Sequence, residues 1–501
     1  MLLVAAFSLL GLFRLAERAA NAEVAIASTL CTALYPVFFA QSSLAHLDLA
    51  AAGLTFWALC AYLEDRPVAV AIWFSLAALA KETAILAPLA LAGWEMLQFV
   101  LPGNASVRNG RVGTAAPGRP VGSCPSPERS RGGSSTAARR ILPLLLPLLP
   151  LALWYTYHYS RTGYIFGNPE FFHYNVAATL DPLRFLLALG LRLWQTFGYL
   201  HLWVLTAAML LAILLPPLKE NTEKPGAPFL GRALRKKRES ARPVERSSTD
   251  LERKRIPIAV QMAFLVVVAA YVIAMALIGG AVLARYMLPA VPLVIIVAIS
   301  TLRRRLRYWP AAVALVGVAF IAAWFWNPPY GFSPEDNLAY RDYIVLHEDA
   351  ERFLEARYPM ARVLTAWPAS DELTRPWLGY TTRPVQVVRI EDFSLEEVLS
   401  AAEFRQNDGP QKFEVALVFS TKYEPPHSLL DRFLGMLGRG LARKWEDVKR
   451  RFFGFHRDLP PVMAAQVLGG RIVFQEKREG QWVAVIELER GEILNARSER
   501  M

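Results

Sequence analysis

Apolar residues in this chain are grouped in long blocks that are separated by short polar connectors. A helix of roughly 18 or more apolar residues crosses a bilayer core of about 30 Å, and several blocks reach that length. The pattern therefore predicts a polytopic α-helical membrane protein with about ten transmembrane helices. The blocks lie at residues 1–13, 24–40, 47–63, 68–80, 83–101, 141–157, 200–218, 257–278, 282–301 and 310–326.

Arginine and lysine gather in three of the connectors. Residues 102–140 hold seven arginines against a single acid, residues 219–256 hold two basic runs, and residues 303–307 hold four arginines. Positive charge retains short loops in the cytoplasm, so all three connectors are predicted to be cytoplasmic. The two long ones, 102–140 and 219–256, are expected to be disordered.

The composition agrees with a membrane protein. Of the 501 residues 54% are hydrophobic and 20% are charged, and the mean hydropathy is +0.27. The net charge of +12 is also typical of nucleic-acid-binding proteins. Because the basic residues concentrate in the connectors, we favour membrane topology and expect no nucleic-acid partner. The three cysteines, Cys31, Cys60 and Cys124, provide neither a disulfide framework nor a zinc spacing.

A consistent topology follows if the three basic connectors share one side. The chain must cross an even number of times between them, which 141–157 and 200–218 satisfy, so 184–199 is predicted to lie along the outer interface. The same count places the connectors at 14–23 and 64–67 inside. It places the connector at 41–46, the break near Lys81 and everything after Asn327 outside.

The count also places Met1 outside the cytoplasm, and the first block lacks the basic start of a signal peptide. We therefore expect a further helix and loop to precede this sequence in the natural protein. An apolar segment encoded in frame upstream would support this expectation, and an immediate upstream stop codon would exclude it.

Residues 327–501 have a different pattern, which predicts a soluble extracytoplasmic α/β domain after a membrane domain at 1–326. Apolar strands alternate with helical stretches, and this alternation favours a largely parallel sheet. A hairpin is expected at the end, with its turn at Glu479-Gly480. No nucleotide-binding or metal-binding motif is recognisable. The expected strands are 361–367, 385–390, 414–420, 471–477 and 482–488, and the expected helices are 341–357, 394–404 and 428–452.

Three charged positions at the ends of apolar blocks are costly in a membrane and so need a reason. Asp48 opens one block, Lys81 divides an apolar stretch, and Arg285 with Tyr286 lies in a short turn. The crossing count places all three on the outer face, where they suit an anionic lipid head group and an acid. Each also has a simpler explanation: Asp48 as a helix cap, Lys81 as a snorkelling cation, and Arg285 as a head-group anchor.

The predicted outer loop 158–183 is rich in aromatic residues that stand beside polar ones. Tyr164, Asn168, Glu170 and His173 are candidates for a wall that packs against a sugar or acceptor. The alternative is an aromatic belt at the membrane interface, which is more common. The histidines of this part of the chain are scattered and offer no metal-ligand spacing.

Three motifs together resemble the GT-C membrane glycosyltransferases, in particular the branch of protein mannosyltransferases, aminoarabinose transferases and RgtA/B/C/D-like bacterial enzymes. The resemblance covers roughly residues 1–326 and rests on the order of the motifs. The motifs are Tyr35-Pro36 through Asp48, Ala80-Lys81-Glu82-Thr83, and Arg285-Tyr286-Met287-Leu288-Pro289-Ala290-Val291-Pro292. The tail is similar to extracytoplasmic α/β domains attached to some of these enzymes.

The resemblance implies a transferase that moves a sugar from a polyprenyl-phosphate donor to a lipid, glycan or protein acceptor at the outer face of the inner membrane. It implies that Asp48 is a secondary acid and that Lys81, Arg285 and Tyr286 bind the donor phosphate. In the family the principal catalytic aspartate lies in the first outer loop, which this sequence lacks. That departure leaves open whether this polypeptide alone is active.

Two other classes of function remain. A transporter for lipid-linked saccharides would spread charges over depth and contain an internal repeat, and neither is visible in the sequence. A non-catalytic assembly or sensor protein of the cell envelope would work through its exported domain. No cofactor is expected, and a divalent cation is left open.

Overall fold

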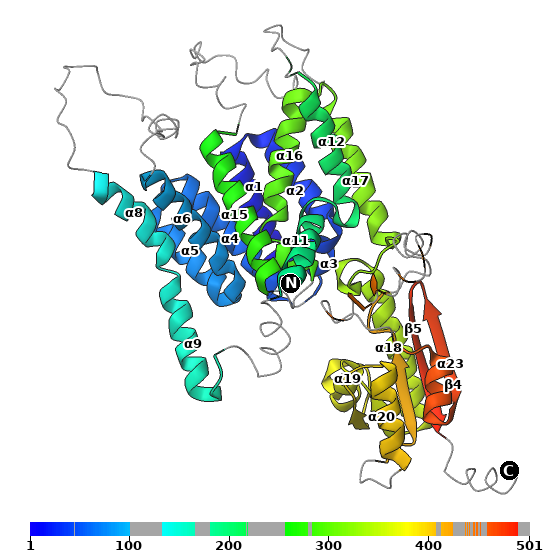
Figure 1. The fold of residues 1–501 in the computed structure, drawn as a ribbon. Coiled ribbons are helices and arrows are strands. Elements are labelled where there is room, and N and C mark those ends of the chain that lie inside the picture. Colours follow the sequence, from blue (N-terminus) through cyan, green and yellow to red (C-terminus); the bar gives the residue numbers. More distant parts are fainter. Residues whose placement is uncertain are drawn as a thin grey trace, which may run out of the picture. The chain divides into compact units, whose positions relative to one another are not determined.

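The computed structural model describes residues 1–44, 46–100, 133–165, 181–216, 218, 256–278, 283–406, 412–423 and 458–488, with a few single residues between 436 and 451. The chain divides into two compact units, Met1–Ala322 and Ala323–Met501. The first is a group of helices and the second contains a sheet with helices (Figure 1).

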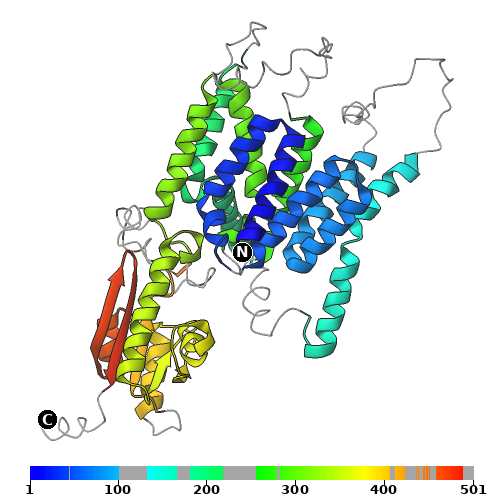
Figure 2. The same ribbon diagram turned by 180° about the vertical axis from the view of Figure 1, so that it is seen from behind.

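The helices of the first unit follow the predicted apolar blocks, and prolines mark several of their breaks. Pro36 begins a short helix after Tyr35, and Pro147 separates two helices, because proline offers no backbone N–H for the preceding turn. The helices, drawn from behind in Figure 2, are α1 (Leu2–Ala19), α2 (Ala22–Leu34), α3 (Pro36–Gln41), α4 (Leu47–Leu63), α5 (Pro67–Ala80), α6 (Leu86–Val100), α8 (Gly133–Leu145), α9 (Leu148–Thr162), α11 (Pro182–Phe197), α12 (Leu202–Leu214), α15 (Ile258–Ile278), α16 (Val291–Arg305) and α17 (Trp309–Phe325). Short 3₁₀ turns are η1 (Glu82–Ile85), η4 (Tyr199–His201) and η5 (Ala284–Met287).

Several of these helices indicate a multi-pass membrane protein. Four stretches are long and apolar enough to cross a membrane: Glu82–Val100, Arg139–Thr162, Pro182–Leu214 and Ile258–Ile278. Shorter apolar helices accompany them, namely Ala22–Leu34, Leu47–Leu63, Pro67–Ala80 and Trp309–Phe325. Large apolar side chains such as Leu211, Leu214 and Leu265 are exposed on their surfaces, as a lipid environment requires. Helices suited to crossing a membrane are therefore present where apolar blocks were predicted, while the number ten stays a prediction.

Ion pairs connect the ends of the helices that the sequence assigned to the cytoplasm. They join the end of α1 to the connector after α4, that connector to α8, and the end of α16 to the start of α2. The pairs are Arg18–Glu64 at 2.8 Å, Arg140–Asp65 at 3.4 Å and Arg303–Glu23 at 2.8 Å. The 15 residues of α16 span about 22 Å, so η5, which precedes α16, lies at the opposite end of the unit. Which side of the membrane each end faces stays a prediction.

Small residues bring α1 and α4 close together. The Ser8 hydroxyl donates to the Leu49 carbonyl oxygen at 3.1 Å, and a side chain at Gly53 would collide with Ser8. Trp57 Nε1 donates to the Phe7 carbonyl oxygen at 3.2 Å. Close approach through small residues is a common way for membrane helices to associate. The contact fixes the beginning of α4, which carries Asp48.

Helix ends differ from the prediction in two places. α1 continues through Arg14 and Glu17 into the segment 14–23 that was predicted to be a connector. Its last turns can remain helical because Arg14 is exposed and Glu17 half-buried. Residues 133–140, predicted as the end of a disordered loop, form the first turns of α8. The rest of 102–140, and 219–255, lie outside the described residues.

That 184–199 lies along the membrane interface stays a prediction. α11, η4 and α12 together form a stretch long enough to cross a membrane, but the backbone is left-handed at Leu200 and His201, so the chain kinks between α11 and α12. Arg184 and Arg192 are buried in the protein, while Leu186 and Leu193 on the other face are exposed. An interfacial helix would direct its charges toward water. The sequence reveals the two faces but not which one meets the protein.

The second unit contains a five-stranded mixed sheet of order β2-β1-β3-β5-β4. β1 (Arg362–Thr365) is parallel to β2 (Gln386–Arg389) and to β3 (Val415–Phe419). β5 (Gln481–Leu488) is antiparallel to both β3 and β4 (Gly470–Arg478). The predicted strands and hairpin are confirmed, but the largely parallel sheet is wrong, because the hairpin pairs with the central strand β3.

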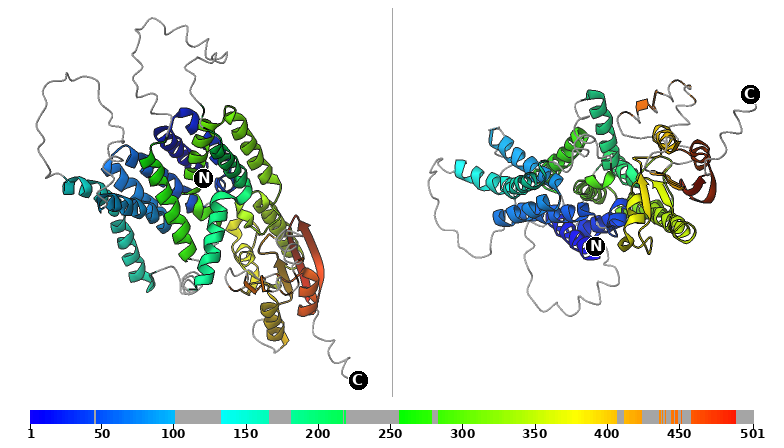
Figure 3. Two further views of the ribbon diagram at one scale, coloured as in Figure 1. Left: turned by 45° about the horizontal axis from the view of Figure 1, so that its top comes forward. Right: turned by 90° about the horizontal axis from the view of Figure 1, so that it is seen from below.

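Helices flank this sheet, as two further views show (Figure 3). All five residues of β3 are buried, so both faces of the central strand are covered. The helices are α18 (Ala339–Arg357), α19 (Ala369–Thr374), α20 (Leu395–Gln406) and α23 (Pro461–Leu468). α18 and α20 were predicted, whereas the short α19 and α23 were not. Most of the predicted helix 428–452 lies outside the described residues.

Candidate active site

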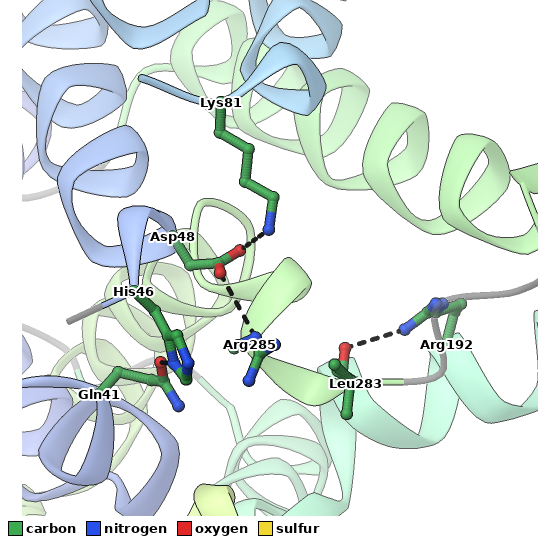
Figure 4. A network of polar contacts seen from close by, with 7 residues as sticks. All are labelled: Gln41, His46, Asp48, Lys81, Arg192, Leu283 and Arg285. Atoms are coloured by element: carbon green, nitrogen blue, oxygen red, sulfur yellow. Dashed lines mark hydrogen bonds and ion pairs between the residues drawn. The ribbon is translucent and has the colours of Figure 1, made fainter. Parts of the chain in front are cut away.

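Asp48, Lys81 and Arg285 come from three distant parts of the sequence and meet at one end of the first unit (Figure 4). The side chains are 7%, 16% and 14% exposed, respectively. The structure therefore brings together three of the predicted site residues. Their chemical roles stay predictions.

Asp48 is positioned by the start of α4. The chain ends α3 at Gln41, turns, and begins α4 at Leu47 with His46 as the capping residue. Asp48 lies in the first turn, where the helix dipole favours a negative charge. The capping residue His46 makes no side-chain hydrogen bond to the helix, and the carboxylate of Asp48 is engaged by two cations. A cap alone therefore does not explain this residue.

Lys81 is positioned by the break between α5 and η1. Its backbone is extended, with φ −156° and ψ 126°, so α5 ends there and the side chain leaves the helix. The ammonium group Nζ donates to Asp48 Oδ1 and lies 3.7 Å from the centre of the Tyr286 ring. A cation over an aromatic face is stabilised by the ring quadrupole. The break thus serves to direct Lys81 toward the start of α4.

Arg285 and Tyr286 lie in η5, between α15 and α16. Pro289 and Pro292 prevent α16 from extending backward, because each lacks a backbone N–H. The short turn that results presents Arg285 to Asp48, with 3.4 Å between Nε and Oδ2. The guanidinium carbon is 5.9 Å from the centre of the Tyr286 ring. Tyr286 therefore contacts both cations.

The charges at this site do not cancel. Two cations, Lys81 and Arg285, face one carboxylate, Asp48, which leaves a net charge of +1 among three largely buried groups. Burying charge is expensive even when it is paired, and charges in membrane segments are functional by default. An anion is the natural partner for the remaining positive charge. The arrangement can hold a phosphate while Asp48 keeps both cations in place.

Arg192 of α11 was not predicted as a site residue. It is buried, and its Nη1 donates to Gln195 Oε1 at 2.7 Å and to the Leu283 carbonyl oxygen at 3.2 Å. Leu283 is the capping residue just before η5, two positions before Arg285 (Figure 4). Arg192 therefore holds the turn that presents Arg285. Arg192 and Leu283 are 91 residues apart, so no local pattern in the sequence indicates that they are in contact.

If the site catalyses a reaction, as proposed below, replacing Arg192 with methionine is expected to reduce the turnover of that reaction, because Arg285 is no longer held in position. Methionine retains much of the length but cannot donate to Leu283, so η5 loses a link worth about 1.5–3 kcal/mol. Turnover should fall about tenfold or more, with a smaller change in expression and folding. Steady-state kinetics of Arg192→Met would measure this, with Leu193→Met as the control because Leu193 is exposed. Equal turnover in both variants would contradict the positioning role.

His46 also borders the site, and the sequence did not predict it as a site residue. Its Nδ1 lies 2.8 Å from Gln41 Oε1 (Figure 4). Burial lowers the pKa of His46 below 6.5, and the charges of Arg285 and Lys81 act in the same direction while Asp48 opposes them. The imidazole is therefore neutral at neutral pH. The feature of the sequence that could have identified His46 as a site residue is its position two residues before Asp48.

A pH dependence of stability follows from this lowered pKa. Between pH 8 and 7 His46 is neutral in both the folded and the unfolded chain and contributes no slope. Below about pH 6.5 the unfolded chain takes up the proton first, so stability falls as the pH falls toward the folded pKa. We expect the melting temperature of His46→Gln to decline less than that of wild type between pH 7 and 5. If the melting temperatures of wild type and His46→Gln declined equally, His46 would not contribute to the pH dependence of stability.

The predicted aromatic wall is largely outside the described residues. Asn168, Glu170 and His173 fall there, whereas Tyr164 is described. Tyr164 follows Gly163, which ends α9 in the left-handed region at φ 77°. Tyr164 is exposed. Its backbone carbonyl oxygen lies near His158 Nδ1 and accepts a hydrogen bond from the Thr162 hydroxyl, both on α9. In the described part of the chain no hydrogen bond or ring contact links Tyr164 to the Asp48 site.

Comparisons with protein-family models, with curated proteins and with solved structures found no match for this chain. The site must therefore be interpreted from its own residues. Among the described residues of the first unit, no three His, Cys, Asp or Glu side chains are grouped as metal ligands would be.

Proposed function

We propose that the protein is a membrane glycosyltransferase that moves a sugar from a polyprenyl-phosphate donor to a lipid, glycan or protein acceptor at the outer face of the cytoplasmic membrane. The observation that carries the proposal is the cluster of Asp48, Lys81 and Arg285. Its net positive charge is buried at one end of a set of membrane helices. A phosphate attached to a lipid tail fits both the charge and the location.

The chemistry proposed is displacement at the anomeric carbon of the donor. The acceptor oxygen bonds to that carbon, the bond from the carbon to the phosphate oxygen breaks, and polyprenyl phosphate leaves with the bonding electrons. A general base takes the acceptor proton. Arg285 and Lys81 stabilise the charge that develops on the leaving phosphate. Asp48 orients both cations, because its two oxygens face Lys81 and Arg285, respectively.

Glycosyl transfer can be tested with the full-length protein in detergent. Polyprenyl-phosphate sugars labelled in the sugar would be supplied, and labelled acceptor or released sugar would be measured. Saturable release that depends on the lipid phosphate would support the proposal. Binding of the lipid-linked sugar without release would favour transport or a non-catalytic role in envelope assembly instead.

Sidedness is tested separately by cysteine labelling. Cys124 lies in the connector proposed to be cytoplasmic, while Cys31 and Cys60 are buried. A membrane-impermeant maleimide should label Cys124 only after permeabilisation, whereas Ser43→Cys, an exposed position next to the site, should be labelled in intact cells. Labelling of Cys124 in intact cells would place the site on the cytoplasmic side and remove the proposed donor chemistry.

A further inference from the structure

A second cluster of titratable groups lies in the C-terminal unit and shares no residue with the candidate active site. His347, Glu351 and Glu372 each offer one ligand atom within 4.8 Å of the others. The residues are 1%, 0% and 7% exposed. Carboxylates are rarely buried this completely unless they are paired or bind a metal ion.

The local sequence explains why these three side chains meet. His347 and Glu351 are four residues apart on α18 and therefore share one face of the helix. Glu372 lies in the first turn of α19, which follows β1 closely. Aromatic rings fix the imidazole: Tyr343 lies 4.2 Å and Phe419 4.5 Å from it, between ring centres. The ligand atoms are thus held by regular elements and packing.

The cluster lacks partners that would account for its charge. His347 Nδ1 lies 2.7 Å from Glu372 Oε2. Among the described residues no group donates a hydrogen bond to either carboxylate oxygen of Glu351 or pairs with Nε2 of His347, although Glu351 is close enough to Glu372 for the two carboxyl groups to share a proton. No lysine or arginine among the described residues forms an ion pair with Glu351 or Glu372. The cluster therefore brings buried acceptor atoms within 4.8 Å of one another without a cation among the described residues to balance them.

We propose that His347, Glu351 and Glu372 bind a divalent transition-metal cation, with Zn²⁺ as the representative ion. A charge of +2 balances the two carboxylates. One nitrogen and two carboxylate oxygens are three of the four ligands that zinc takes, and a second oxygen of one carboxylate or a water would supply the fourth. Calcium and magnesium need six or more oxygen ligands or several waters, which a fully buried three-residue cluster does not supply.

The role of this cation is structural. The three ligands are buried, so a substrate has no open approach, and the ion joins α18 to α19 across the end of β1.

The competing occupant is a proton shared between the two carboxylates. Burial, reinforced by Glu372, raises the pKa of Glu351 to about 10, which would keep that proton in place without a metal. The two occupants give different results when metal content is measured. The proposal is independent of glycosyl transfer.

The test uses the full-length protein in detergent, with metal content measured by mass spectrometry after incubation with Zn²⁺ and removal of the excess. Wild type and Asp349→Asn should each retain about one Zn²⁺ per chain, because Asp349 lies on α18 but half-exposed beside Arg352. Glu351→Gln and His347→Gln should retain at least tenfold less. A chelator should lower the melting temperature of wild type and leave that of Glu351→Gln unchanged.

Two outcomes would overturn the proposal. Zn²⁺ bound equally by wild type and Glu351→Gln would place the ion elsewhere. Wild type without bound Zn²⁺, and with a melting temperature that a chelator does not change, would show that a proton occupies the cluster. The second result does not require any variant to fold.

Discussion

Replacing Arg285 with alanine is expected to reduce glycosyl transfer by about 100- to 1,000-fold, as loss of a donor to a developing anion does in other enzymes. The effect should appear mainly in kcat, because the phosphate gains charge as the bond to the sugar breaks. The measurement is turnover of a saturating polyprenyl-phosphate sugar by the full-length protein. Arg285 is largely buried but lies in a short turn, so the helices should still assemble.

Arg307→Ala is the matched control for this prediction. Arg307 is exposed beyond the opposite end of α16, where its guanidinium stacks on Tyr308 at 5.6 Å. The Arg307→Ala substitution removes the same charge as Arg285→Ala but leaves the contacts of Asp48 intact. If both alanine variants lost turnover equally, the loss would reflect overall charge or folding. If neither lost turnover, Arg285 would not belong to the site.

Replacing Asp48 with asparagine is expected to destabilise the protein by on the order of 3–5 kcal/mol, because it leaves two buried cations without their counter-charge. Transfer should fall as well, since Lys81 and Arg285 then repel each other. Thermal unfolding in detergent measures the first effect. Asn is nearly isosteric with Asp, so loss of packing contributes little to either result.

A double-mutant cycle separates charge from shape in this prediction. Lys81→Met removes one of the two cations, so Asp48→Asn combined with Lys81→Met should be more stable than the sum of the single changes predicts. The coupling arises because Asp48 and Lys81 are in direct contact. Strictly additive effects would mean that the ion pair contributes nothing, and Asp48 would then act only at the start of α4.

The sequence predicted most of the architecture because apolar blocks and alternating strands depend on local pattern. The hairpin of β4 and β5 and the strands β1 to β3 appear where expected. The direction of the strands was not predictable, because it depends on β5 pairing with β3, whose paired residues lie 64 to 72 positions earlier in the chain. The amphipathic α11 shows the same limit, since its pattern does not reveal whether the arginines face water or protein.

For the site, sidedness alone was enough to group Asp48, Lys81 and Arg285, because each interrupts an apolar block at a position fixed by the crossing count. What the sequence lacked were residues whose importance depends on a distant partner. Arg192 matters only through the carbonyl of Leu283, and His347 only through the approach of Glu372. Neither pair has a spacing that a motif search recognises.

Binding of polyprenyl phosphate tests the central claim most directly, since it asks whether the positive cluster holds a lipid-borne phosphate. Equilibrium binding of labelled polyprenyl phosphate to the purified full-length protein would be compared in wild type, Arg285→Gln and Arg307→Gln. We predict saturable binding of about one molecule per chain, weakened roughly 10- to 100-fold by Arg285→Gln and unchanged by Arg307→Gln, as loss of one charge-assisted contact requires. Equal affinity in all three proteins would contradict the account.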